Sequence, residues 1–162
     1  MTYKEFLESK IELATDSGFV VEPEKVNKIL KPHQRDAVIW ALKGGRRALF
    51  ESFGLGKTVQ EIEFCHLAAE QCGGRALIVL PLGVKQEFTR DAVDVLGYEK
   101  PEYCRTMEEV EKSTSQIVLT NYERVRDGDI RPEYFCATSL DEASVLRSFG
   151  SKTYQTFLDK FK

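Results

Sequence analysis

The feature that most constrains the fold of this chain is a glycine-bearing segment in its first half. The residues Gly54-Leu55-Gly56-Lys57-Thr58 follow a short apolar stretch, Arg47–Phe50, that predicts a strand, and they precede a segment that predicts a helix. Two glycines let the backbone turn tightly enough for several N–H groups to point at one anion. The helix start adds partial positive charge. Lys57 offers a full charge to the β- and γ-phosphates of a nucleotide, and Thr58 offers a hydroxyl to Mg²⁺.

One position of this predicted phosphate loop departs from the general pattern. The pattern begins with glycine, and the chain has Glu51 there. A chance Gly-x-Gly-Lys-Thr in a turn is the alternative interpretation, but the strand–loop–helix context favours a site for ATP and Mg²⁺. The predicted nucleotide contacts in the loop are Gly54, Leu55, Gly56, Lys57 and Thr58.

Apolar runs that alternate with helical segments predict the fold class. Ala76–Leu80 and Ile117–Thr120 are continuously apolar or nearly so, which is typical of strands buried on both faces. Alternation of strands and helices predicts an α/β fold, a three-layer parallel sheet with helices on both faces. The further predicted strands span 102–104 and 135–140, and the predicted helices span 2–14, 32–44, 57–71, 83–96, 107–112 and 151–161.

Composition adds modest limits. The 162 residues correspond to about one domain. The net charge of −3 differs from the strongly basic composition of simple DNA-binding modules, although a local basic face is compatible with it. Without an apolar run long enough for a membrane span or a signal-peptide core, we expect a cytoplasmic protein that contacts no membrane. We expect reduced, mostly buried thiols at Cys65, Cys72, Cys104 and Cys136, with disulfides or a metal as the alternatives.

An acidic pair follows the last predicted strand. Ligands of parallel sheets collect at the carboxyl ends of the strands, where Asp141 and Glu142 stand. We predict that Asp141 holds Mg²⁺, directly or through water, and that Glu142 orients and polarises the water that attacks the γ-phosphate. A solvated pair that caps the following helix is the alternative, and the upstream phosphate loop favours the catalytic interpretation.

These motifs and their order resemble those of superfamily-2 helicases and translocases, most of all the Swi/Snf-like branch and related phage and bacterial DEAD/DEAH-type proteins. The resemblance covers roughly residues 19–162 and implies a RecA-like phosphate-loop lobe. In this branch an acidic residue often replaces the first glycine, so Glu51 fits. Leu30–Arg35 resembles the Q motif, which implies that Gln34 reads adenine; an exposed helix residue is the alternative. Ser144 departs from the family's Asp-Glu-Ala-Asp and Asp-Glu-Ala-His forms.

Two further segments resemble family motifs that contact nucleic acid. Residues 80–88 resemble motif Ia and residues 119–123 resemble motif Ib. The resemblance implies backbone contacts, to DNA rather than RNA, by Pro81, Lys85, Thr120 and Asn121. A plain surface lysine and a strand end with an Asx turn are the alternatives for Lys85 and for Thr120-Asn121.

The resemblance also implies a domain organisation. We expect an N-terminal helical extension over 1–31 and a RecA-like ATP-binding lobe over 32–162, incomplete because the chain ends before motif III and so lacks its last strand. ATP hydrolysis would drive translocation, remodelling or unwinding together with a second RecA-like lobe, so the isolated chain is expected to hydrolyse ATP slowly or not at all. The alternatives are a non-catalytic nucleotide- or DNA-binding module and a phosphate-loop ATPase without a nucleic-acid role.

Overall fold

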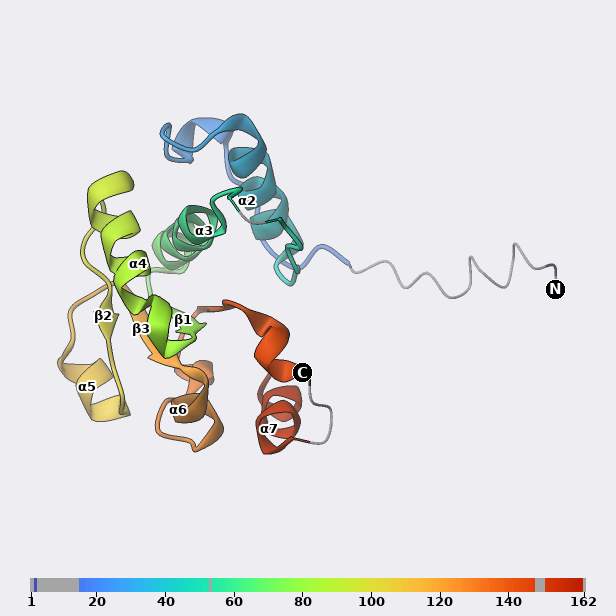
Figure 1. The fold of residues 1–162 in the computed structure, drawn as a ribbon. Coiled ribbons are helices and arrows are strands. Elements are labelled where there is room, and N and C mark those ends of the chain that lie inside the picture. Colours follow the sequence, from blue (N-terminus) through green and yellow to red (C-terminus); the bar gives the residue numbers. More distant parts are fainter. Residues whose placement is uncertain (1, 3–14, 53, 148–150, 162) are drawn as a thin grey trace.

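A parallel sheet forms the centre of the protein (Figure 1). The computed structural model describes residues 2, 15–52, 54–147 and 151–161. Within them, four strands lie in the order β2-β3-β1-β4, and every neighbouring pair is parallel. The strands are β1 (Ala76–Leu80), β2 (Glu102–Tyr103), β3 (Ile117–Asn121) and β4 (Ala137–Leu140). The predicted α/β class is therefore confirmed.

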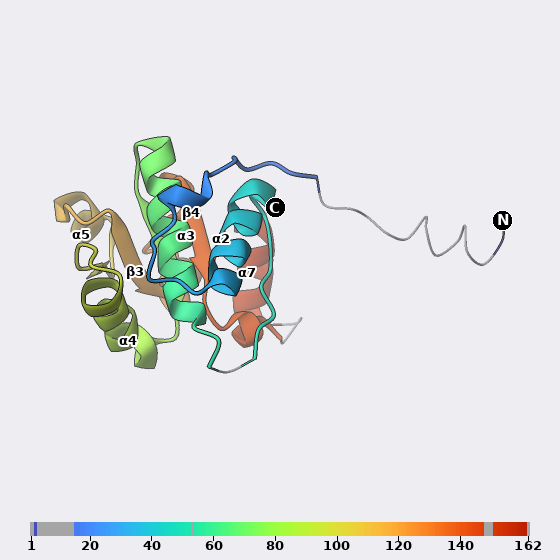
Figure 2. The same cartoon turned by 90° about the horizontal axis from the view of Figure 1, so that it is seen from above.

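Helices cover both faces of the sheet and complete three layers (Figures 1 and 2). All five residues of β1 have no exposed surface, because the strand has a neighbour on each side and helices above and below. Its side chains alternate between two core clusters, as the two-residue period of a strand requires. The first cluster contains residues of α2 (Pro32–Gly44), α3 (Lys57–Cys72) and α4 (Lys85–Arg90), and the second contains residues of α5 (Met107–Lys112), α6 (Tyr122–Arg126) and α7 (Lys152–Lys160).

The segment before α2 packs into the first core cluster. Val21, Val26 and Leu30 are buried there. Glu63 of α3 is fully buried and accepts hydrogen bonds from the Asn27 backbone N–H, at 2.8 Å, and from the Tyr98 hydroxyl. Only a 3₁₀ turn, Pro23–Lys25, interrupts the irregular backbone of residues 15–31. The helix predicted over 2–14 lies outside the described residues, apart from Thr2.

Short irregular helices join the regular elements at several points. A π-helical turn, Asp91–Val95, continues α4, so the helix predicted over 83–96 consists of two parts. The remaining 3₁₀ turns are Leu82–Val84, Pro132–Tyr134 and Ala143–Leu146. The helices predicted at 32–44, 57–71, 107–112 and 151–161 are present, with ends that differ by at most one residue.

The strand predicted at Arg47–Phe50 is wrong. These residues lie outside the sheet, and Phe50 is 96% exposed. A strand is stabilised by ladder hydrogen bonds to a neighbour, which a short apolar run cannot supply by itself. β4 forms an edge of the sheet, and no described residue pairs with its outer side.

The expectation of four reduced cysteines is also wrong. A disulfide joins Cys72 at the end of α3 to Cys136 just before β4, with the Cα atoms 6.5 Å apart. The fold brings these residues together although 64 positions separate them in the sequence. No local sequence pattern predicts such a contact. Cys65 and Cys104 are free and buried as predicted, and burial raises the pKa of both thiols, that of Cys104 to about 11.

This disulfide predicts redox-dependent stability. A cross-link that closes a loop of this length restricts the unfolded chain and is worth about 2–4 kcal/mol. We expect a reductant to lower the free energy of unfolding of the wild type by that amount in urea titrations. The variant Cys72→Ser should unfold at the same urea concentration with and without reductant. Equal wild-type stability under both conditions would contradict the cross-link.

Candidate nucleotide site and basic pocket

The predicted phosphate loop has the backbone of an anion site. Gly54 and Gly56 have φ angles of +81° and +75°, in the left-handed region that favours glycine. Gly56 caps the N-terminus of α3, so Lys57 and Thr58 are the first two residues of that helix. A side chain at Gly56 would also collide with Gln34, because a Cβ there would lie 2.3 Å from its Nε2. The positive φ angle therefore favours glycine at this position, and a side chain there would also displace the Gln34 amide.

Gln34 joins the start of α2 to this loop. Its Oε1 accepts a hydrogen bond from the Lys31 backbone N–H at 2.8 Å, and its Nε2 donates to the Leu55 carbonyl at 2.8 Å. The side chain is buried, so the alternative of an exposed helix residue is wrong. Each end of an amide has a second hydrogen-bonding position. Gln34 thus links the start of α2 to the loop through both ends of its amide.

A second glutamine, which the sequence did not single out, supports the loop from inside. Gln60 is 1% exposed, and its Nε2 donates to Glu51 Oε2 at 2.8 Å and to the Leu55 carbonyl at 3.2 Å. Glu51 therefore receives a defined partner at the position where other phosphate loops have glycine. The signal in the sequence was a polar residue on the mostly apolar face of a helix, which also carries the buried Glu63.

The acidic pair lies beside the loop. The backbone N–H of Asp141 donates to the Val79 carbonyl of β1 at 2.8 Å, which fixes the end of β4. Burial raises the pKa of Asp141, with a contribution from the neighbouring charge of Glu142, while a backbone hydrogen bond and the Lys57 ammonium oppose the shift. Lys57 is thus close enough to act on Asp141. The structure brings together residues that are 84 positions apart in the sequence, the difference between 141 and 57.

Glu142 occupies an unusual backbone conformation. Its φ angle of +51° makes it the one non-glycine residue with positive φ among the described residues. Its carboxylate accepts a hydrogen bond from the Ser144 hydroxyl. Ser144, the residue that departs from the family pattern, therefore contacts the side chain predicted to orient water. The Tyr122 hydroxyl donates to the Asp141 carbonyl at 2.6 Å and holds the same turn from the side of α6.

Glu61 is a third carboxyl group at this site. The Ser139 hydroxyl of β4 donates to its Oε1 at 2.6 Å. Burial of the carboxyl group raises its pKa to about 8, with a further contribution from the charge of Asp141, and both the Ser139 hydrogen bond and the Lys57 charge oppose this shift. Glu61 is therefore largely protonated at neutral pH, and it links the helix of the phosphate loop to the strand that carries the acidic pair.

The residues present fit Mg²⁺. This ion is held in nucleotide sites by one or two protein oxygen ligands together with phosphates and water. Thr58 offers a hydroxyl and Asp141 a carboxylate whose pKa is raised chiefly by burial. In the part of the chain that the structure describes, no group of three or more His, Cys, Asp or Glu residues is arranged for a metal. A site completed by the phosphates of a nucleotide agrees with that observation.

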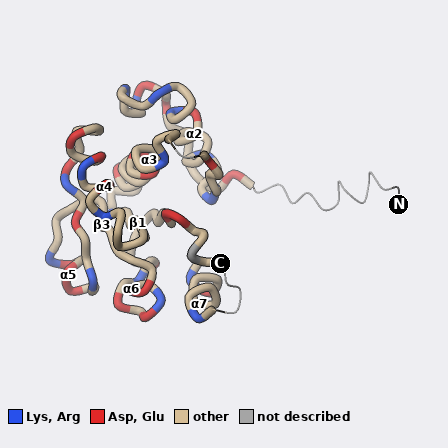
Figure 3. The backbone as a smooth tube through the Cα atoms, viewed as in Figure 1, with Lys and Arg blue, Asp and Glu red and all other residues tan. Residues whose placement is uncertain are grey.

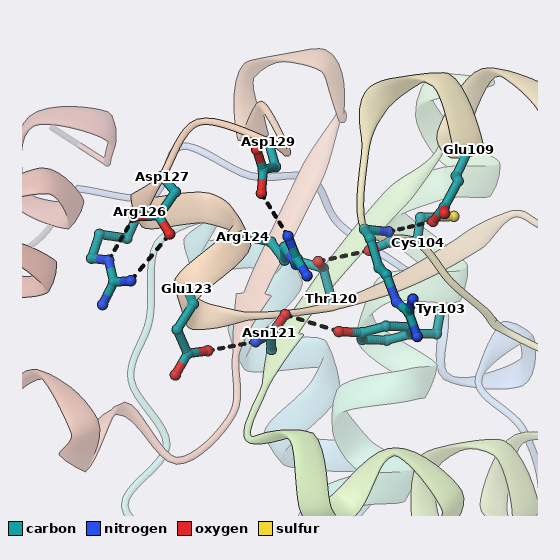
Figure 4. A network of polar contacts seen from close by, with 11 residues as sticks. Tyr103, Cys104, Glu109, Thr120, Asn121, Glu123, Arg124, Arg126, Asp127 and Asp129 are labelled. Atoms are coloured by element: carbon teal, nitrogen blue, oxygen red, sulfur yellow. Dashed lines mark hydrogen bonds and ion pairs between the residues drawn. The ribbon is translucent and has the colours of Figure 1, made fainter.

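A basic pocket opens at the carboxyl ends of β1, β2 and β3, and Figure 4 shows the polar contacts of Tyr103, Asn121 and Arg124, which belong to its lining. Its volume is about 540 Å³, and its lining residues are Leu82, Gly83, Lys85, Gln86, Tyr103, Arg105, Asn121 and Arg124. The Tyr103 hydroxyl donates to Asn121 Oδ1 at 2.9 Å, and Lys85 Nζ lies 4.8 Å from the centre of the Tyr103 ring. Lysine and arginine are otherwise interspersed with acidic residues along the chain (Figure 3).

Two of the four residues predicted to contact nucleic acid line this pocket. These are Lys85 and Asn121, whereas Pro81 is not among the lining residues. Thr120 is fully buried, and its hydroxyl donates to the Cys104 carbonyl at 2.8 Å. The sequence analysis missed Arg105 and Arg124, which belong to different segments and meet only in the folded protein. Both arginines oppose the rise that burial causes in the pKa of Tyr103, so both act on its hydroxyl.

Solved structures of known proteins have the same fold. The UvsW helicase of bacteriophage T4 matches with a TM-score of 0.65 at 19% identity, over 99% of this chain and 56% of that chain. A second T4 UvsW structure matches with a TM-score of 0.59 at 18% identity, over 97% and 32%. The SWI2/SNF2 ATPase core of Sulfolobus solfataricus, solved in complex with double-stranded DNA, matches with a TM-score of 0.65 at 18% identity, over 85% and 31%. The chain therefore shares its α/β fold with the matched parts of these solved structures.

This chain spans from 31% to 56% of the length of those solved chains. No protein-family model and no curated protein sequence matches it. In the described residues, no helix has the length and apolar composition that a membrane span requires. The expectation of a RecA-like α/β lobe is confirmed.

Glu61 gives the site a testable pH dependence. Its pKa is raised above the unfolded value of 4.5 to about 8, so the folded state binds this proton more tightly. The corresponding stability is complete below pH 4.5 and is lost as the pH rises through 8. We expect urea titrations between pH 5 and pH 8 to show a smaller fall in the free energy of unfolding for Glu61→Gln than for the wild type.

The control is Glu111→Gln, which changes an exposed glutamate of α5. This variant should keep the pH dependence of the wild type, because its carboxylate is solvated in both states. If Glu61→Gln and the wild type lose stability in parallel over this range, Glu61 is ionised in the folded protein and the assignment is wrong.

Proposed function

We propose that this lobe binds ATP with Mg²⁺ and contributes to its hydrolysis in a helicase or translocase that acts on DNA in the cytoplasm. One observation carries the proposal: the phosphate loop and the acidic pair, from distant parts of the sequence, lie close enough for Lys57 to influence Asp141. Their order and placement support the function that the fold suggests, since ligands of parallel sheets bind at the carboxyl ends of the strands.

Each residue has a role in this proposal. Lys57 and the backbone amides of Gly54, Leu55 and Gly56 hold the phosphates, and Gln34 reads adenine with its remaining hydrogen-bonding positions. Thr58 and Asp141 hold Mg²⁺, which neutralises charge on the β- and γ-phosphate oxygens when bound. Glu142 orients the attacking water. A second RecA-like lobe would supply the arginine finger, whose absence costs about 10³–10⁵ in rate.

The basic pocket is the proposed contact with nucleic acid. Lys85, Arg105 and Arg124 place three basic side chains in one concave surface, within a chain whose net charge is −3, and Arg124 is paired with Asp129 at 2.9 Å. Such charges bind backbone phosphates irrespective of base sequence. Two of them flank the Tyr103 hydroxyl, which is held by Asn121. The charge and the concave shape of the pocket support DNA binding over a phosphate-loop ATPase without a nucleic-acid role.

The nucleotide site is tested by Lys57→Ala. Removal of the ammonium group should weaken binding of a fluorescent ATP analogue by at least about tenfold, because a charge-assisted contact to phosphate contributes about 1.5–3 kcal/mol. Lys112→Ala is the matched control, since Lys112 is an exposed lysine that pairs with Glu108 far from the loop. Equal affinity of Lys57→Ala and the wild type would refute the phosphate-loop assignment.

The basic pocket is tested by Arg105→Ala and Arg124→Ala. Each should weaken binding of unrelated DNA sequences to a similar extent and reduce the salt slope of binding by about 1, as loss of one phosphate contact does. Arg126→Ala serves as the control, because Arg126 lies on α6 and pairs with Asp127 as Arg124 pairs with Asp129, but does not line the pocket. Unchanged salt slopes for both pocket variants would place the nucleic-acid contact elsewhere.

A further inference from the structure

The short helix α4 touches both proposed sites. Its first two residues, Lys85 and Gln86, line the basic pocket. The next residue, Glu87, turns to the phosphate loop, where its Oε1 accepts a hydrogen bond from the Thr58 hydroxyl at 3.2 Å. Phe88 is 1% exposed and fixes the helix in the first core cluster. Three consecutive residues of α4 therefore reach two sites from a rigidly packed segment.

The direction of the Thr58–Glu87 hydrogen bond is informative. A threonine hydroxyl has one proton to donate and two lone pairs to offer. Because Thr58 donates its proton to Glu87, its lone pairs remain available and their direction is fixed. A ligand oriented by an outer hydrogen-bond partner is a general device of metal sites. The contact is thus compatible with Mg²⁺ at Thr58 and prepares the hydroxyl for it.

Glu87 also acts on the other proposed ligand of Mg²⁺. Its charge is among the influences that raise the pKa of Asp141, so its carboxylate lies in the electrostatic field of that group. The side chain of Glu87 is exposed, and although Glu87 lies within residues 80–88 that resemble motif Ia, it was not among the predicted contacts. It therefore stands beside the proposed metal position without being one of its predicted ligands.

We propose that Glu87 is a positioning residue that orients Thr58 toward Mg²⁺ and couples the nucleotide site to the basic pocket through α4. The inference rests on the proposed function of the two sites. When Mg²⁺ and nucleotide bind, they favour this orientation of the Thr58 hydroxyl. The Thr58–Glu87 hydrogen bond then restricts the position of Glu87, and hence that of the neighbouring residues Lys85 and Gln86. Coupling of this kind is reciprocal, so DNA in the pocket favours Mg²⁺–nucleotide binding to the same extent.

The first test compares Glu87→Leu and Glu87→Gln in the full chain. The leucine removes the acceptor at similar volume, whereas the glutamine keeps an acceptor oxygen without the charge. In Mg²⁺ titrations with a fluorescent ATP analogue, we expect the half-saturating Mg²⁺ concentration to rise about tenfold for Glu87→Leu, the scale typical of lost outer partners, and less than about threefold for Glu87→Gln. Nucleotide affinity measured in EDTA should be unchanged in both.

The controls separate this inference from a folding defect and from the proposed function. Glu111→Leu changes an exposed glutamate of α5 and should leave the Mg²⁺ titration unchanged. An unchanged titration for Glu87→Leu overturns the inference, and so does a lower half-saturating concentration, which would make Glu87 a competitor of the metal. An equal rise in the half-saturating Mg²⁺ concentration for Glu87→Gln and Glu87→Leu also overturns it, because the charge of Glu87 and not its hydrogen bond would then matter.

The second test measures coupling. DNA affinity is determined with and without Mg²⁺ and a non-hydrolysable ATP analogue, and the ratio of the two affinities is compared between variants. We expect the wild-type ratio to exceed about 5, the lower end of usual couplings, and that of Glu87→Leu to approach 1. If Glu87→Leu and Glu87→Gln both keep the affinity ratio of the wild type, the inference is overturned but the proposed function is not. If the wild type binds no nucleotide, or if Lys57→Ala leaves nucleotide affinity unchanged, the proposed function is overturned as well.

Discussion

The pairing of β1 with both of its neighbours is the interaction on which the rest of the structure depends. β1 places Ala76–Val79 opposite Ala137–Leu140 of β4 on one side and Ala76–Leu80 opposite Ile117–Asn121 of β3 on the other. All three strands run in the same direction, so their carboxyl ends meet at one edge. That edge carries the acidic turn after β4 and the pocket after β1 and β3. A slip of one residue in either ladder would move the side chains of the slipped strand to the opposite face of the sheet.

Buried polar groups add a second level of order around the phosphate loop. Gln34 from α2 and Gln60 from α3 both donate to the Leu55 carbonyl, so two helices fix one peptide group of the loop. Loops normally satisfy their backbone groups with water because they run over the surface. Here the loop is held by side chains from two sides.

The sequence predicted those parts of the fold that local patterns encode. Buried strands such as β1 and β3 are continuous apolar runs, and α3 begins at a glycine and ends at a glycine in the left-handed conformation. The errors concern contacts across the sequence. Arg47–Phe50 has the composition of a strand but lacks a partner, and Cys72 meets Cys136 only after the sheet has formed. Likewise, the phosphate loop was recognisable as a motif, whereas Arg105 and Arg124 become neighbours only through the parallel order of β2 and β3.

The disulfide divides the molecule in a way that the layers do not. It closes a covalent ring from residue 72 to residue 136, and every residue that lines the basic pocket lies inside that ring. The phosphate loop and the acidic pair lie outside it, on the two arms that leave the ring at α3 and β4. A peptide bond cut within the ring would leave the two fragments joined, with both halves of the nucleotide site still on one covalent molecule. The two proposed sites thus differ in connectivity as well as in chemistry.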